Sequence, residues 1–277
     1  MNKFAYLVLA FMAFLAVSCS KSTEIYPSAT IEDFAPMQIG KYITYRLDST
    51  VTTNFGVAFE VHTYEVKFLV DAQITDNLGR PAYRIFRYIR NNPGQAWLPD
   101  NTFTATNTGT SFEFVENNLR YIKLKLPIKD NYSWKGNSYI ESTSINTELM
   151  YLYDWDYFYE NVYQPATVGS MVLDSTITIN QREDSVGVPI TPETQYAEKN
   201  ISKEIYAKNI GMVYRNFLHW EFQRVNNSYT GYGAVSYTHL RAHETVLDLV
   251  CRLLLEKKKK KHSDVRHIHH MYKYMNI

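Results

Sequence analysis

The sequence predicts an all-β protein: a curved antiparallel sheet, half-barrel or open barrel of roughly eight to ten strands. Its 277 residues include 23 Tyr, 14 Phe and 4 Trp, which favour strands. Apolar and polar residues alternate along several segments, and no long run before residue 235 has a helical period. Residues 37–233 are enough to bury a single core, so we predict one β-domain there.

The start of the chain predicts export and a lipid anchor. The short basic start Met1–Lys3 precedes an uninterrupted apolar segment, Phe4–Val17. A membrane-spanning helix needs about 20 residues, so this shorter segment suits a secretory signal peptide instead. Leu15–Cys19 (LAVSC) resembles the lipobox of bacterial lipoproteins. We therefore predict a signal peptide over residues 1–18 and lipidation of Cys19; an ordinary signal peptide with an incidental cysteine is the alternative.

The residues that follow Cys19 bear on where the anchor holds the protein. By analogy with lipoprotein sorting, Ser20 points to the outer membrane, whereas Lys21–Glu24 only weakly resembles a surface-export signal. Residues 19–36 show no apolar period, and we predict that they form the lipidated cysteine and its tether. The membrane is thus a predicted partner through the lipid, and periplasmic and surface-facing orientations both stay open.

Alternation predicts the first strands. In Tyr42–Asp48, three apolar side chains share one face of the strand. The apolar positions of Phe59–Val70 change parity, which predicts a β-bulge near His62–Thr63. Asp76–Gly79 predicts a turn, and Ala82–Arg90 predicts the next strand.

Three later segments show the same alternation. In Leu119–Leu126 we predict Ile122, Leu124 and Leu126 inward and Tyr121, Lys123 and Lys125 outward; in Met171–Asn180 we predict Met171, Leu173, Ile177 and Ile179 inward. In the last segment we predict Met212, Tyr214, Leu218, Trp220 and Phe222 inward, opposite Arg215, His219, Glu221 and Gln223. Ile190–Asn200, with two prolines nearby, is predicted as an exposed loop.

Two phrases carry a family resemblance. Phe34–Thr50 (FAPMQIGKYITYRLDST) and Glu204–Gln223 (EIYAKNIGMVYRNFLHWEFQ) resemble the opening and a late strand of uncharacterised outer-membrane lipoproteins of Bacteroidota. Gly40 and Gly211 each precede a long strand in these phrases, where a flexible backbone suits a tight entry. The resemblance implies the fold and the location, and it brings no known activity.

The stretch Tyr151–Tyr163 (YLYDWDYFYENVY) is the main candidate binding segment. Seven of its thirteen residues are aromatic. Tyr and Trp rings beside Asp and Asn can stack on sugars and bond their hydroxyls. The alternative is a loop that packs over the open end of the barrel and closes its core. The candidate ligand-binding residues are Tyr151, Tyr153, Asp154, Trp155, Asp156, Tyr157 and Tyr159.

Few residues suggest catalysis. His219 and Glu221 share one face of a strand and could form an acid–base pair, although a solvated face explains them as well. Asp154, Asp156 and Glu160 offer carboxylates beside aromatic rings, as a glycosidase cleft would. His62 and His219 are the only histidines before residue 234, too few for a histidine-based metal site without carboxylates. We predict no catalytic residue, no metal site and no cofactor.

The C-terminal segment 234–277 is predicted to be foreign to the natural protein. Val235–Thr245 (VSYTHLRAHET) and Leu249–Glu256 (LVCRLLLE) back-translate to parts of a sequencing-library adaptor. Lys257–Lys261 would be a translated adenine run. We therefore expect the β-domain to be truncated near Gly233, with a short or frayed last strand and no native contribution from the tail.

Without the tail, residues 20–233 hold 19 Lys and Arg against 24 Asp and Glu, so no nucleic-acid partner is indicated. The sequence favours a non-catalytic, lipid-anchored β-module of the outer membrane, structural or interaction-type, with an envelope protein or glycan as partner. The alternatives are a lipoprotein that binds a glycan or an apolar ligand, and a glycoside hydrolase.

Overall fold

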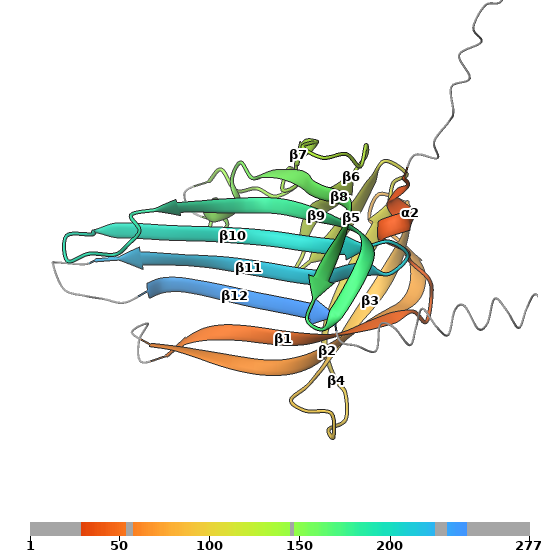
Figure 1. Ribbon diagram of the computed structural model, residues 1–277, viewed down its shortest axis with the longest axis horizontal. Helices are drawn as coiled ribbons and strands as arrows, with labels where there is room; N and C mark the ends of the chain where they lie inside the picture. Colours follow the sequence, from red (N-terminus) through yellow and green to blue (C-terminus); the bar gives the residue numbers. More distant parts are fainter. Residues whose placement is uncertain (1–28, 54–57, 145–146, 225–231, 243–277) are drawn as a thin grey trace, which may run out of the picture.

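The computed structural model describes residues 29–53, 58–144, 147–224 and 232–242 of the chain. The predicted signal peptide, Cys19 and residues 243–277 lie outside the described residues. The described part is all-β, as predicted, with one short α-helix and one 3₁₀ turn (Figure 1). Within it, no helix is long and apolar enough to cross a membrane.

Consecutive strands pair with one another in antiparallel fashion, except β6 and β7, which are the two end strands of the sheet. The helical elements are α2 (Ile31–Phe34) and η2 (Met150–Leu152). The strands are β1 (Tyr42–Thr53), β2 (Ala58–Thr75), β3 (Pro81–Arg90), β4 (Leu98–Asn107), β5 (Ser111–Glu116), β6 (Leu119–Lys125), β7 (Ser133–Lys135), β8 (Asp156–Val168), β9 (Met171–Val186), β10 (Tyr196–Ala207), β11 (Gly211–Gln223) and β12 (Tyr232–Ala242).

The strands form one antiparallel sheet that curls into a nearly closed barrel (Figure 1). The order across the sheet is β6-β5-β4-β3-β2-β1-β12-β11-β10-β9-β8-β7. The two ends meet, because the backbone N–H of Ile122 on β6 donates to the carbonyl of Gly136, just after β7, at 2.8 Å. The indole N–H of Trp134 on β7 donates to the carbonyl of Ile122 at 2.8 Å. These contacts bring the first and last strands of the sheet together.

The twelve strands exceed the predicted eight to ten. The predicted strands at Tyr42–Asp48, Ala82–Arg90 and Met171–Asn180 are confirmed within β1, β3 and β9. The additional strands include β5 and β7, of 6 and 3 residues, which are too short to show a clear alternation. The predicted loop Ile190–Asn200 is wrong at its C-terminal end, because β10 begins at Tyr196.

Two groups of buried side chains form the core. The larger group joins α2 to strands β2–β10, and Ile31 and Phe34 of α2 are fully buried in it. The second group packs the end of the β8–β9 hairpin against β1, β11 and β12. Together they leave space inside the barrel rather than filling it.

The predicted bulge near His62–Thr63 is wrong. The β1–β2 pairing runs without a shift through Ser49↔His62 and Asp48↔Thr63. Phe59 and Val61, whose parity suggested the bulge, are instead exposed on β2, so they need not face the core. A register shift does occur further along, between Val70 and Ala72 in the β2–β3 pairing.

The last strand is neither short nor frayed, against expectation. β12 spans 11 residues and pairs with both β1 and β11. Leu240 and Ala242 are buried in the second core group, and this burial explains why the strand is retained. Residues 234–242 therefore contribute to the sheet, and the foreign origin of segment 234–277 stays a prediction.

Candidate functional site

The interior of the barrel holds a cavity of about 440 Å³, which we call the inner cavity. Strands β6, β8, β9, β10 and β11 and the segment around η2 supply most of its wall, and Glu116 of β5 and Thr238 of β12 complete it. Asn117, in the turn between β5 and β6, lies exposed at its rim. The lining is rich in aromatic rings: Tyr121, Tyr151, Trp155, Tyr157 and Phe217.

The polar part of this lining is a group of paired charges. Lys123 on β6 is 4% exposed and donates to Glu204 Oε1 on β10 at 2.6 Å. Tyr206 donates its hydroxyl to the other oxygen of Glu204 at 2.9 Å. Arg215 on β11 donates to Glu116 at 2.8 Å, and its Nε lies 3.7 Å from Glu204 Oε1. Two cations and two carboxylates therefore neutralise one another inside the barrel.

Burial and charge oppose each other in this group. Burial by itself would raise the pKa of Glu204, but the charges of Lys123 and Arg215 outweigh it and lower that pKa. The pKa of Glu116 is lowered in the same way, with Arg215 as the main opposing charge. Both carboxyl groups are thus held as carboxylates near neutral pH.

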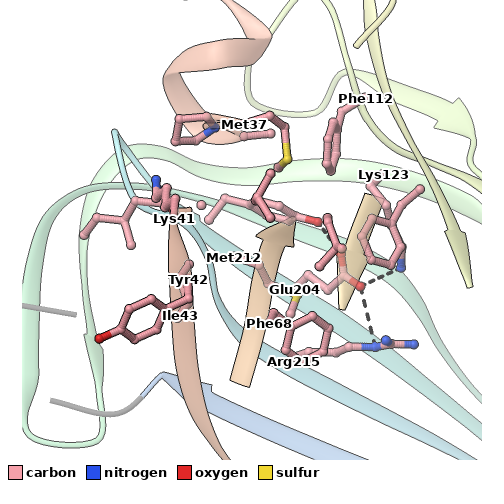
Figure 2. Close-up of a pocket in the computed structure, with 18 of the residues that line it drawn as sticks. Met37, Lys41, Tyr42, Ile43, Phe68, Phe112, Lys123, Glu204, Met212 and Arg215 are labelled. Atoms are coloured by element: carbon pink, nitrogen blue, oxygen red, sulfur yellow. Dashed lines mark hydrogen bonds and ion pairs between the residues drawn. The ribbon is translucent and has the colours of Figure 1, made fainter. Parts of the chain in front are cut away.

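A second, smaller cavity of about 90 Å³ lies on the other side of these charges (Figure 2). Apart from Lys41 and the charged group, its walls are mostly apolar and include Met37, Phe68, Phe112 and Met212. Figure 2 shows Glu204 between Lys123 and Arg215, and both cations line this cavity as well as the inner cavity. The charged group therefore lies between the small, mostly apolar cavity and the larger inner cavity, whose lining is both aromatic and polar.

The structure divides the seven candidate residues of the aromatic stretch. Tyr151, Trp155 and Tyr157 line the inner cavity. Tyr159 is fully buried, and its hydroxyl donates to the carbonyl of Lys125 at 2.9 Å, so it serves packing. The remaining three, Tyr153, Asp154 and Asp156, do not line the inner cavity and have exposed side chains.

The carboxylates suggested for a glycosidase are held at the surface. Asp154 and Asp156 both accept from Lys135 Nζ, at 2.5 and 3.0 Å. Glu160 lies 3.5 Å from Lys203 Nζ. None of the three lines the inner cavity, so they do not form the facing pair that glycoside hydrolysis requires.

The alternative for the aromatic stretch, a loop that closes the core, describes part of it correctly. Leu152 and Trp155 are nearly fully buried, at 1% and 2% exposure. Trp155 donates its indole N–H to the carbonyl of Tyr151 at 2.6 Å, which fixes the turn. The same segment therefore closes the barrel and supplies part of the wall of the inner cavity.

His219 does not lie on a solvated face, contrary to one of the two interpretations above. It is 5% exposed, its Nδ1 lies 2.7 Å from Asn200 Oδ1, and its ring stacks on Tyr151 at 3.8 Å. Burial lowers its pKa, so the ring is neutral near pH 7. Glu221 is 3.9 Å from its Nε2, and neither residue lines the inner cavity.

The inward face of β6 is the reverse of the predicted face, and the prediction for β11 is right only in part. On β6, Tyr121 and Lys123 line the inner cavity, whereas Ile122 and Leu124 pack in the larger core group with Trp134. On β11, Met212 lines the smaller cavity and Phe222 is fully buried, as predicted. Between them, however, Arg215 and Phe217 line the inner cavity, and His219 is buried while Trp220 is only partly buried. Val213 is the extra residue of a bulge in β11, since Tyr206 pairs with Met212 and Ile205 with Tyr214.

Sequence reasoning therefore missed Lys123, Gln181, Ser202, Glu204 and Arg215 as cavity residues. A lysine between Ile122 and Leu124 was a usable signal, because a charge inside a strand with two covered faces must be paired. In the part of the chain that the structure describes, no group of three or more His, Cys, Asp or Glu side chains could hold a metal ion.

Comparison with known proteins places the chain near no characterised family. No family model matches the sequence, and no curated protein matches it. Among solved structures, it is similar to a presumed exported protein with a YmcC-like fold from Bacteroides fragilis. The TM-score is 0.34 at 11% identity, over 76% of this chain and 96% of that one.

Proposed function

We propose that this protein is a non-catalytic, lipid-anchored module of the bacterial envelope that binds a small ligand inside its barrel. The inner cavity is the observation that carries the proposal. Its volume of about 440 Å³ falls within the range of about 300–1,000 Å³ that is usual for small-molecule sites. Its combination of aromatic rings with a few polar groups is also usual for such sites.

The charges around the cavity support binding rather than catalysis. A general acid or base must be free to exchange a proton with a bound substrate. Lys123 and Glu204 face each other at 2.6 Å, and Arg215 is bonded to Glu116. Because each charge already has an opposite partner, the group shapes and neutralises the cavity wall.

The anchor is part of the same proposal and rests on the sequence around Cys19. We expect mass spectrometry of the mature protein from a Gram-negative host to find a diacylglyceryl modification on Cys19 as its N-terminal residue. The Cys19→Ala variant should keep its signal segment. A mature N-terminus at or after Ser20, without lipid, would contradict the anchor and the outer-membrane location.

Ligand binding is tested by filling the cavity from its wall. Leu149 lines the inner cavity and is partly buried, so the larger ring in Leu149→Trp should occupy ligand space. We expect any ligand found by thermal-shift screening of the full-length protein to bind at least about tenfold more weakly to this variant, since a clash removes most of the contacts.

Leu98→Trp is the matched control, because Leu98 is 62% exposed and outside the cavity. It should bind like the natural protein in calorimetric titrations. The screen should cover uncharged saccharides, acidic saccharides and fatty acids. The proposal fails if no class binds at millimolar concentration, or if Leu149→Trp binds as well as Leu98→Trp.

A further inference from the structure

Two buried hydrogen-bond donors in the inner cavity have no acceptor among the described residues. They are Nε2 of Gln181 and Nε of Arg215; the latter is ion-paired with Glu204 Oε1 at 3.7 Å, beyond hydrogen-bonding distance. Gln181 is 2% exposed, and its Oε1 accepts from Ser202 Oγ at 2.5 Å, so the amide is held in place. Buried donors without acceptors are rare in folded proteins. Two of them on one cavity wall indicate that a ligand supplies the acceptors.

The backbone at Gln181 supports this interpretation independently. In the β9–β10 pairing, Lys203 is opposite Asn180 and Ser202 is opposite Arg182. Gln181 is therefore the extra residue of a β-bulge. Bulges occur beside binding sites, where they redirect a side chain. Here the bulge lets the Gln181 side chain line the cavity beside Ser202.

The balance of charge defines the ligand further. Lys123 and Arg215 are matched by Glu204 and Glu116, so the wall offers donors without a net positive charge. An anionic ligand would compete with the carboxylates for both cations, and a purely apolar ligand would leave the two donors unpaired. The ligand should be uncharged and rich in acceptor oxygens.

The aromatic rings of the cavity wall provide apolar surface against which a ligand can pack. Tyr121, Tyr151 and Phe217 are only partly buried and present aromatic carbon to the same space, and the buried rings of Trp155 and Tyr157 complete the wall. An uncharged sugar ring has hydroxyl oxygens around its edge and C–H groups on its faces, which suits donors and rings together. We propose that the inner cavity binds an uncharged saccharide unit, whose oxygens accept from Gln181 Nε2 and Arg215 Nε. This inference rests on the proposed function and names its ligand class.

The first test compares ligand classes by isothermal titration of the full-length protein. The probes are neutral disaccharides of hexoses and of N-acetylhexosamines, with glucuronate and decanoate as the acidic and apolar alternatives. We expect at least one neutral disaccharide to bind, and glucuronate and decanoate to bind at least about tenfold more weakly, because a polar site rejects ligands that leave its donors unpaired. Preferential binding of decanoate or glucuronate would refute the neutral saccharide as the ligand class but would still agree with the proposed ligand-binding function. No binding by any of the probes would refute both claims.

The second test removes one donor. Gln181→Met keeps the length of the side chain and deletes the amide; it should weaken disaccharide binding by roughly 10- to 100-fold, as loss of a buried bond to a ligand does. The substitution also removes Oε1, the acceptor of the buried Ser202 hydroxyl, so the melting temperature of the unliganded variant should fall modestly. Affinities are therefore compared at a temperature at which all the variants are folded. Gln195→Met makes the same change at an exposed position outside the cavity and should bind normally. Equal affinity of Gln181→Met and Gln195→Met would refute the assignment.

Discussion

Replacing Glu204 by leucine is expected to lower the free energy of unfolding by about 3–5 kcal/mol, because it leaves buried Lys123 without its partner. Glu204 is only 1% exposed and is the one carboxylate within 4 Å of both Lys123 and Arg215 among the described residues. Without it, two cations would face each other across the interior. Urea denaturation monitored by tryptophan fluorescence measures the effect.

The double variant Lys123→Met, Glu204→Leu should recover most of that loss, since replacing both members of a buried pair by apolar residues is often close to neutral. Asp184→Asn is the surface control. Asp184 pairs with Arg182 at 2.7 Å in an exposed position, so its loss should cost at most about 1 kcal/mol. A Glu204→Leu variant as stable as Asp184→Asn would mean that the interior is wet enough to solvate the charges.

Gly136→Ala is expected to destabilise the protein by about 2–3 kcal/mol, through overpacking against a rigid ring. A Cβ at this position would lie 2.3–2.5 Å from three ring atoms of Tyr157, which is itself fully buried. The carbonyl of Gly136 also accepts from Ile122 N–H, the bond that joins β6 to the β7 end of the sheet. Thermal melts of the full-length protein report the change.

Gly109→Ala separates overpacking from backbone strain. Gly109 has φ +84° and open space around it, so alanine there should cost only the left-handed conformation, about 1–2 kcal/mol. In a Tyr157→Leu background, which removes the ring, Gly136→Ala should cost clearly less than in the natural protein. If the melting temperature of Gly136→Ala equals that of the natural protein, the two ends of the sheet do not meet as described.

Alternation predicted where strands lie much better than which face is inside. In β1 and β9 the predicted apolar sets, such as Ile43 with Tyr45 and Ile177 with Ile179, are buried. In β6 the apolar face was taken to be the interior one. Both faces of β6 are covered, because Ile122 and Leu124 pack with Trp134 and Ile140 while Lys123 meets Glu204 inside the barrel.

Bulges explain the rest of the discrepancy. Val213 in β11 is an extra residue and reverses the parity of the positions after it, until a second register shift at Glu221/Phe222. Gln181 in β9 is also an extra residue, but it lies just beyond the correctly predicted segment Met171–Asn180. A single sequence shows no mark of such a bulge when the flanking residues are apolar on both parities. The aromatic stretch was recognisable from composition, and three of its seven candidate residues line the cavity, but the paired charges opposite them come from strands far away in the sequence.

The claim that the barrel interior is a ligand site is tested most directly by a crystal structure of the full-length protein grown with a saturating neutral disaccharide. We predict electron density for a sugar ring in the inner cavity, with an oxygen in hydrogen-bonding distance of Gln181 Nε2 and a ring face against Tyr121, Tyr151 or Phe217. A sugar found only on the outer surface of the barrel, or an inner cavity holding nothing but water at saturation, would contradict the account.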